Sequence, residues 1–300
     1  MEFNSLIFRP PRPTYSFADL AGNIIFIPKK IQDKFDSLHN SFEVCEDFQY
    51  MTVDQIMMKP HKAFPVDCIP CLLIPHKEGS SKIIVFFHGN SEDIGRTFNL
   101  LQKISDNLGV HVISVEYQGY GIYEGNTSEK NLYLDCELII YFLIKFAKWK
   151  EENIILFGRS IGSGPGTYLA SKYNISALIL MSAFTSMKEV VGSHLGFLNF
   201  FVKDQFRNID NIKTCRCPVF ILHGNLDKIV PVSHSKELHM HCKQPTMLVL
   251  AKEMNHNDFD FDKDLMNPLK EFFIKLKISF EGKEILYLPM ECFYEPIIIN

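Results

Sequence analysis

The chain of 300 residues has no excess of positive charge. Its 31 lysine and arginine residues are outnumbered by 35 aspartate and glutamate residues, so the formal net charge is -4. A nucleic-acid-binding protein needs a basic surface against phosphate, and we therefore set that partner class aside. Tryptophan occurs once, but 26 phenylalanines and a hydrophobic share of 46% supply material for a large core. This composition argues against disorder.

Long apolar runs are also missing. The longest, residues 138 to 146, contains Lys145 and follows two acidic residues, so it is too short and too charged to cross a bilayer and predicts a buried helix. Near the start, Glu2 stands where a secretory signal has positive charge, and Arg9 with two prolines interrupts the apolar stretch. We therefore expect a cytoplasmic protein with no transmembrane segment and with, at most, peripheral contact to membranes.

The eight cysteines form no regular framework, which indicates reduced thiols rather than a disulfide scaffold. Two close pairs, Cys68 with Cys71 and Cys215 with Cys217, have the ligand type of a zinc site. Both pairs border apolar strand-like runs, however, which favours packing over metal binding. We expect no metal and no cofactor.

Short apolar segments alternate with amphipathic segments along most of the chain. Residues 92 to 108 have apolar side chains at helical spacing and end before Gly109, a typical C-cap, and residues 132 to 149 predict the next helix. Apolar strands that alternate with helices predict a mainly parallel sheet covered on both faces. The predicted strands are Lys82 to Phe87, Val110 to Tyr117, Ile154 to Phe157, Ala177 to Met181, Val219 to Leu222 and Met247 to Leu250.

The segment Gly158-Arg159-Ser160-Ile161-Gly162 lies between a strand-like run and a helix-like run. This is the pattern of a nucleophile elbow, in which a serine occupies a sharp strand-to-helix turn and the glycines leave room for neighbouring backbone. The following helix points its N-terminal amides at whatever Ser160 attacks, which favours negative charge on a substrate oxygen.

In proteins with a parallel sheet, ligands bind beyond the carboxyl ends of the strands. Ser160, Asp227 and His256 each follow a predicted strand, and their order along the chain is that of an α/β-hydrolase triad. A serine hydroxyl needs an imidazole to take its proton and a buried carboxylate to orient that imidazole. For His88 and His223 we prefer a role in bracing a loop, and for the histidines of the segment after Asp227 a solvent-facing or packing role. The rivals of Asp227 for the acid role are Asp258, Asp260 and Asp262.

An oxyanion hole needs two converging amide donors, one after the nucleophile and one in the loop after the third strand of the fold. These predictions fall on Ile161 and Asn90. The side chain of Asn90, or that of Ser91, is also a candidate N-cap for the helix that begins near Glu92. Either use of the side chain leaves the backbone donor available.

Several blocks of the sequence resemble the Bem46-like α/β hydrolases, and among them the α/β-hydrolase domain-containing protein 17 subfamily. Its members are serine hydrolases that remove palmitate from cysteines of membrane-attached proteins, so the resemblance implies an α/β-hydrolase fold with a small cap insertion and this activity. The resemblance runs from about residue 8 to residue 276. It rests on Pro10 to Tyr15, His88 to Asn90, Gly119 to Gly121, Phe157 to Pro165, Ser182 to Ser186, and His223-Gly224 with Asp227.

The sequence also departs from that subfamily. No cysteine precedes Pro10, whereas the subfamily has a lipidated cysteine cluster there. Glu116 and Tyr123 stand where the subfamily usually has aspartate and serine, and Arg159 stands where glutamine is common. We expect these changes to affect the rim of the pocket and the choice of substrate.

We divide the chain into an N-terminal extension with a proline-rich segment (1–44), an α/β-hydrolase domain (45–280) and a C-terminal tail (281–300). Residues 184–212 are the expected cap region, and the phenylalanines Phe197, Phe200, Phe201 and Phe206 either line an acyl-chain groove or, as we prefer, pack a short helix onto the body. The tail extends past the usual end of the domain.

These observations predict a serine hydrolase that cleaves acyl thioesters or esters through an acyl-Ser160 intermediate. The resemblance implies a palmitoyl-protein thioesterase, whose partners are acylated proteins or lipid-like esters. The same triad and fold also serve lipases, carboxylesterases and serine aminopeptidases, which remain open. An alternative of another class is a catalytically silent protein that binds acylated partners.

Overall fold

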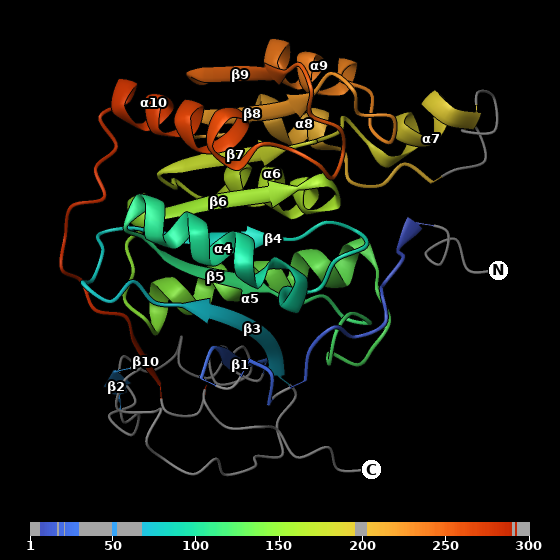
Figure 1. Cartoon of the computed structure of the whole chain (residues 1–300). Helices are drawn as coiled ribbons and strands as arrows, with labels where there is room; N and C mark the ends of the chain where they lie inside the picture. The colour runs from blue at the N-terminus through green and yellow to red at the C-terminus, as the bar shows by residue number, and fades with distance from the viewer. Residues whose placement is uncertain are drawn as a thin grey trace, which may run out of the picture.

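An eight-stranded sheet forms the centre of the computed structural model, which describes residues 7–16, 18–20, 22–29, 50–52, 68–195, 203–289 and 292 (Figure 1). The strand order is β1-β3-β5-β4-β6-β7-β8-β9. The β1–β3 and β3–β5 pairs are antiparallel and the other pairs are parallel, which confirms the predicted mainly parallel sheet. The strands are β1 (Ile24–Pro28), β3 (Cys68–Ile74), β4 (Ile83–Phe87), β5 (His111–Val115), β6 (Ile154–Arg159), β7 (Ala177–Met181), β8 (Val219–Gly224) and β9 (Thr246–Ala251).

Helices cover both faces of the sheet, as predicted. Helices α4 (Ile94–Leu108) and α10 (Asn267–Lys275) bury apolar side chains in one layer, where they lie in front of the strands in Figure 1. The layer on the other face receives side chains from α5 (Glu129–Lys145), α6 (Ser163–Lys172), α8 (Asn208–Lys213) and α9 (Ser233–His241). Helix α7 (Met187–Leu195) follows β7, and short 3-10 helices occupy Glu151–Asn153 and Ser160–Gly162, while a short π-helix occupies Phe261–Met266. None of the helices in the described ranges is long and apolar enough to cross a membrane.

The ends of α4 and α5 differ in part from the predicted ends. The N-cap of α4 is Asp93, whose side chain accepts a hydrogen bond from Arg96 N–H at 3.0 Å, and neither Asn90 nor Ser91 has this role. Gly109 ends α4 with a left-handed φ of 64°, as predicted. Helix α5 starts three residues earlier than predicted because Ser128 caps it.

Both ends of the described chain pack against the body. Strand β1 lies inside the predicted N-terminal extension but forms the edge of the central sheet, so the sheet begins before residue 45. In the predicted tail, Leu286 and Leu288 are buried in the α5 layer, and β10 (Tyr287–Pro289) pairs with β2 (Tyr50–Thr52). The carbonyl oxygen of Glu284 accepts a hydrogen bond from Ser80 N–H at 3.1 Å.

The proline-rich segment is fixed by side chains near the carboxyl end of the sheet. Thr14 N–H donates to Asp93 at 2.8 Å, and the Tyr15 hydroxyl donates to the buried carboxylate of Glu116 at 2.8 Å. The Tyr15 ring leaves no room for a side chain at Gly121, whose φ of 51° also favours glycine. These contacts hold the segment against the loop that follows β4.

The turn from β6 into α6 brings backbone segments unusually close together. Ser160 has a φ of 52°, a left-handed conformation that is costly for a residue with a side chain. A Cβ atom at Gly162 would collide with the carbonyl groups of Phe87 and His88. The turn therefore depends on glycine at position 162. Only glycine lets the backbone of the turn lie this close to the end of β4, and this close packing leaves Ser160 projecting at the end of β6.

Replacement of Gly162 by alanine should destabilise the fold by about 1–3 kcal/mol or more, because the methyl group meets rigid backbone. Gly166→Ala, inside α6, is the matched control. Its methyl group meets the end of the flexible Leu178 side chain most closely and the Gly158 backbone at an ordinary contact distance, so we expect a change of about 1 kcal/mol or less. Urea unfolding followed by the fluorescence of the single, buried Trp149 measures both variants. Equal midpoints for the two variants would contradict the argument.

Candidate active site

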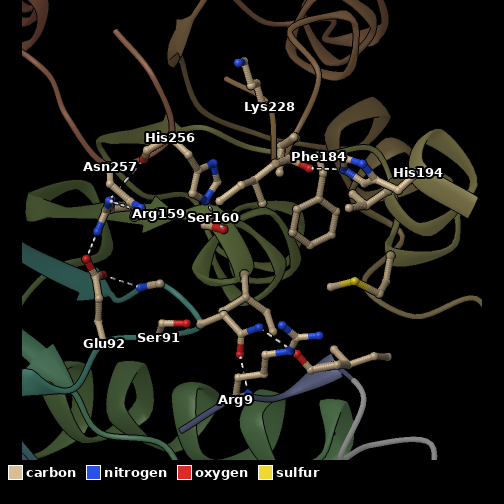
Figure 2. A pocket seen from close by; sticks show the side chains of 18 of the residues that line it. Arg9, Ser91, Glu92, Arg159, Ser160, Phe184, His194, Lys228, His256 and Asn257 are labelled. Carbon is tan, nitrogen blue, oxygen red and sulfur yellow. Dashed lines mark hydrogen bonds and ion pairs between the residues drawn. The ribbon is translucent and has the colours of Figure 1, made fainter. Parts of the chain in front are cut away.

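Strands β6, β8 and β9 end at the same edge of the sheet, and the loops that follow them bring Ser160, Asp227 and His256 together. Figure 2 shows the His256 ring beside Ser160. The Nδ1 atom of His256 lies 2.7 Å from Asp227 Oδ2, and its Nε2 atom lies 3.1 Å from the Ser160 hydroxyl. When Nδ1–H donates to the carboxylate, Nε2 is left to accept the serine hydrogen. This is the arrangement that a hydroxyl nucleophile requires.

Asp227 is held as a carboxylate. It is buried, and its Oδ1 atom accepts hydrogen bonds from the N–H groups of Ile229 and Val230 at 2.9 and 2.8 Å. Burial acts to raise the pKa of Asp227, but hydrogen bonds from His223 and His256 outweigh it and hold the pKa well below the ordinary value. The negative charge is therefore available to orient His256 and to stabilise its protonated form.

The rival carboxylates are used elsewhere. Asp258 accepts a hydrogen bond from the Asn255 side chain at 2.8 Å, and Asp260 caps the short helix that follows it by accepting from Lys263 N–H at 2.8 Å. Asp262 is exposed. The carboxylate that lies against the His256 ring is that of Asp227.

His88 and His223 are completely buried and bond to neighbouring loops. The ring of His88 contacts Glu116 Oε1 at 3.0 Å, and its Nδ1 lies 2.9 Å from the Gly89 carbonyl oxygen. The ring of His223 lies 2.6 Å from the Ser235 hydroxyl and 2.8 Å from the Val230 carbonyl oxygen. Both arrangements fit the bracing role that we preferred for these residues.

The oxyanion donors predicted from the sequence, Asn90 and Ile161, both line the cavity that contains Ser160. The N–H of Gly89 donates to Glu92 Oε2 at 2.8 Å, so this neighbouring amide is already engaged. The side chain of Asn90 caps no helix. Its amide donates to the Ile7 carbonyl oxygen, and its oxygen accepts from Arg9 N–H and from the Tyr120 hydroxyl.

The cavity at Ser160 has a volume of about 970 Å³ and two chemically different sides. In Figure 2, Phe184 and His194 lie on one side of Ser160, and Ser91 and Glu92 lie on the other. Helix α7 and the loop after β8 add further apolar residues to the cavity: Met187, Val190, Val191, Ile229 and Val230. The described part of the expected cap therefore contributes to the cavity wall, whereas Phe197, Phe200 and Phe201 lie outside the described residues. Phe206 is fully buried against Phe8, Tyr133 and Phe184, as the packing role requires.

Sequence reasoning missed the contribution of the N-terminal segment to the site and the contacts that Arg159 makes there. Ile7 and Arg9, from the segment before the prolines, line the cavity. Arg159 reaches from the elbow to Glu92 and to the loop that contains His256. The resemblance to the subfamily includes the proline-rich segment, and this was a weak signal for the role of the N-terminal residues. Side-chain pairs between loops, such as those of Arg159, leave no local pattern in a sequence.

The two cysteine pairs that we considered as zinc ligands lie on different strands of the sheet. Cys68 and Cys71 are in β3, whereas Cys215 and Cys217 precede β8, which is five positions away in the strand order. The Sγ atoms of Cys215 and Cys217 lie 3.6 Å apart, and both residues are buried in the apolar layer. Among the described residues, no three His, Cys, Asp or Glu side chains gather as metal ligands would.

Known proteins resemble this chain in both sequence and fold. Residues 78–209 match a family model described as serine aminopeptidase, S33. Two solved esterase structures, each with a TM-score of 0.59, share the fold. Est1E from Butyrivibrio proteoclasticus, bound to ferulic acid, is 19% identical and covers 69% of this chain and 95% of its own. A Pyrococcus furiosus esterase is 16% identical and covers 89% and 98%.

Curated relatives extend over nearly the whole length. The α/β-hydrolase domain-containing protein 17C of Xenopus tropicalis is 30% identical over 274 residues, which are 89% of this chain and 87% of the relative. The human protein 17B is 30% identical over 275 residues, with coverage of 90% and 89%. With this similarity, the elbow geometry and the strand order taken together, the chain belongs to the α/β-hydrolase domain-containing protein 17 family of α/β hydrolases.

Proposed function

We propose that the protein is a serine hydrolase that cleaves acyl thioesters or esters, with palmitoyl-cysteine of proteins as its substrate class. The single observation that supports this most is the connected chain from Asp227 through His256 to the Ser160 hydroxyl, with heavy-atom distances of 2.7 and 3.1 Å. These three hydrogen-bonded residues lie at a cavity with an apolar side. The family resemblance indicates that the substrate contains an acyl group.

The proposed reaction begins when Ser160 Oγ attacks the acyl carbonyl carbon and its proton passes to His256 Nε2. The N–H groups of Asn90 and Ile161 stabilise the resulting oxyanion, and the ionised Asp227 stabilises the imidazolium. Collapse of the intermediate breaks the bond from carbon to sulfur or oxygen, and the leaving group takes the proton from His256. Water then attacks the acyl-serine with His256 as base, which releases the carboxylic acid and restores Ser160.

A thioester suits this site because a thiolate leaves more readily than an amine and needs less proton donation. The apolar side chains of α7 and of the loop after β8 offer a place for an acyl chain, since burial of each methylene contributes about 0.8 kcal/mol. The esterase structures share the fold, and the matched family model is described as a serine aminopeptidase. Turnover of a palmitoyl thioester, p-nitrophenyl esters, monoacylglycerol and aminoacyl anilides ranks these candidates.

A fluorophosphonate probe should label the purified protein, because the probe captures a serine oxygen that is activated by a neighbouring imidazole. Ser160→Ala should remove the labelling completely, and a burst of acylated enzyme should be seen in the unmodified protein but not in this variant. Labelling that persists in Ser160→Ala would exclude Ser160 as the nucleophile. An unmodified protein without labelling or burst would instead support a silent binder of acylated partners.

Replacement of Asp227 by asparagine should lower kcat roughly ten-thousand-fold. An asparagine oxygen still accepts from Ile229 and Val230, but its NH₂ group then faces His256 Nδ1 and favours the wrong tautomer. Asp258→Asn is the matched control, and we expect kcat within about twofold of the unmodified enzyme, since Asp258 bonds to Asn255. Steady-state hydrolysis of a p-nitrophenyl ester measures both. Similar losses in the two variants would remove Asp227 from the acid role.

A further inference from the structure

The charged residues that line the cavity are mostly cations, although the whole chain has a net charge of -4. Arg9, Arg96, Arg159 and Lys228 line it, and Glu92 is the acidic residue among the lining residues of the described chain. Glu92 is paired with Arg159, so its charge is matched internally. The positive charge that remains belongs to three exposed side chains, those of Arg9, Arg96 and Lys228.

The negative charge of Asp227 offsets only part of this excess, because the four cationic lining residues outnumber Glu92 and Asp227 together. Asp227 lies behind His256, and its oxygens are occupied by the N–H groups of Ile229 and Val230 and by the imidazole. A concave site with one sign of charge concentrates ions of the opposite sign. The cavity is therefore positive for a molecule that approaches Ser160.

Arg9 and Arg96 lie on other elements than α7 and the loop after β8, which supply most of the apolar lining residues, whereas Lys228 belongs to the loop after β8. Arg9 belongs to the N-terminal segment, and its backbone is fixed by a hydrogen bond from its N–H to the Asn90 side chain at 3.0 Å. Arg96 projects from the first turn of α4, where one of its N–H groups donates to the Ser91 carbonyl oxygen. The acyl-chain side, in contrast, is formed by α7 and the loop after β8. The Arg9 and Arg96 side therefore faces whatever the acyl group is attached to.

We propose that Arg9 and Arg96 form a leaving-group subsite that selects acyl substrates with anionic groups close to the scissile bond. Carboxylates beside an acylated cysteine, or phosphates on a thiol carrier, have the required chemistry. The inference rests on the proposed function, because it needs the acyl-transfer reaction at Ser160. Exposed ion pairs are individually weak, so we expect the two arginines together to give a preference of roughly tenfold that weakens with salt.

The test compares kcat/KM for two palmitoyl-cysteine peptides that differ only in flanking residues, a pair of glutamates or a pair of lysines. We expect the unmodified enzyme to prefer the acidic peptide about tenfold at low salt. The double variant Arg9→Gln, Arg96→Gln should reduce this ratio to about twofold or less. Arg12→Gln is the matched control, since Arg12 is an exposed arginine of the same segment that does not line the cavity, and the ratio should be retained.

A second arm compares palmitoyl-coenzyme A with palmitoyl-pantetheine and separates phosphates from carboxylates as the source of the anion. The subsite is supported if the unmodified enzyme prefers the more anionic substrate in either arm and the double variant loses that preference. Equal turnover within both pairs by the unmodified enzyme, or loss of preference in Arg12→Gln to the same degree, overturns it. Failure of the proposed function looks different, because no acyl substrate is then turned over and Ser160 is not labelled.

Arg159 supports a second inference from its contacts alone. It is the last residue of β6, directly before Ser160, and its side chain is buried. One end of the guanidinium pairs with Glu92, and the other donates to the His256 carbonyl oxygen and to the Asn257 side chain, both at 3.2 Å (Figure 2). Glu92 in turn accepts from Gly89 N–H at 2.8 Å.

One guanidinium thus joins three loops: the elbow, the loop with Asn90 and the loop with His256. We infer that Arg159 is a positioning residue, which holds the imidazole and the oxyanion loop in register with Ser160. This inference also rests on the proposed function. The planar fork of arginine is needed because it reaches two loops at once, which the single ammonium of lysine does not.

Arg159→Gln should lower kcat roughly 10- to 100-fold per titrated active site with little change in KM, since small misplacements of catalytic groups have effects of this size. Arg159→Lys should not restore kcat, and Arg159→Gln combined with Glu92→Gln should be no worse than either single variant. Arg216→Gln, an exposed arginine before β8, is the control and should retain kcat. The far-downfield NMR signal of the His256 Nδ1 proton should exchange faster in Arg159→Gln, which is a readout independent of turnover.

A kcat within twofold of the unmodified enzyme in Arg159→Gln, or losses that simply add in the double variant, would overturn the positioning role. An unchanged exchange rate of the His256 proton would do the same. If the unmodified enzyme neither hydrolyses esters nor reacts with fluorophosphonate, the proposed function fails instead.

Discussion

The close backbone approach at the elbow is the constraint on which the site depends. Gly162 lies against the end of β4, and this contact sets where α6 begins relative to the loop that contains Asn90. The same contact leaves Ser160 in a left-handed conformation at the end of β6. Residues far apart in the chain are thereby placed around one oxygen atom, and the parallel sheet supplies the common edge at which their loops meet.

Electrostatics then determines the state of each group around that atom. The pKa of Asp227 stays low because its hydrogen bonds more than compensate for burial. A carboxylate with a depressed pKa stabilises the fold above the pKa of the unfolded chain, and this contribution is lost only as the pH falls through the lower folded value. The Asp227 charge is thus present beside the His256 ring throughout the neutral pH range.

Most of the fold could be predicted from the sequence because apolar strands and amphipathic helices leave a local periodic pattern. The elbow was also visible, since its glycines and serine are adjacent in the chain. Contacts between loops leave no such pattern. The bond from Asn90 to the N-terminal segment and the reach of Arg159 to His256 both depend on how distant loops fold back. The sequence predicted no role for the tail, but the structure buries its Leu286 and Leu288 in the apolar layer that contains α5.

The hydrogen bonds between Asn90 and the backbone of Ile7 and Arg9 have a consequence for orientation. They fix the beginning of the described chain to the rim of the cavity, a short distance from the reacting serine. A group attached to the chain beside Arg9 would therefore lie at the mouth of the cavity, not at the far side of the sheet.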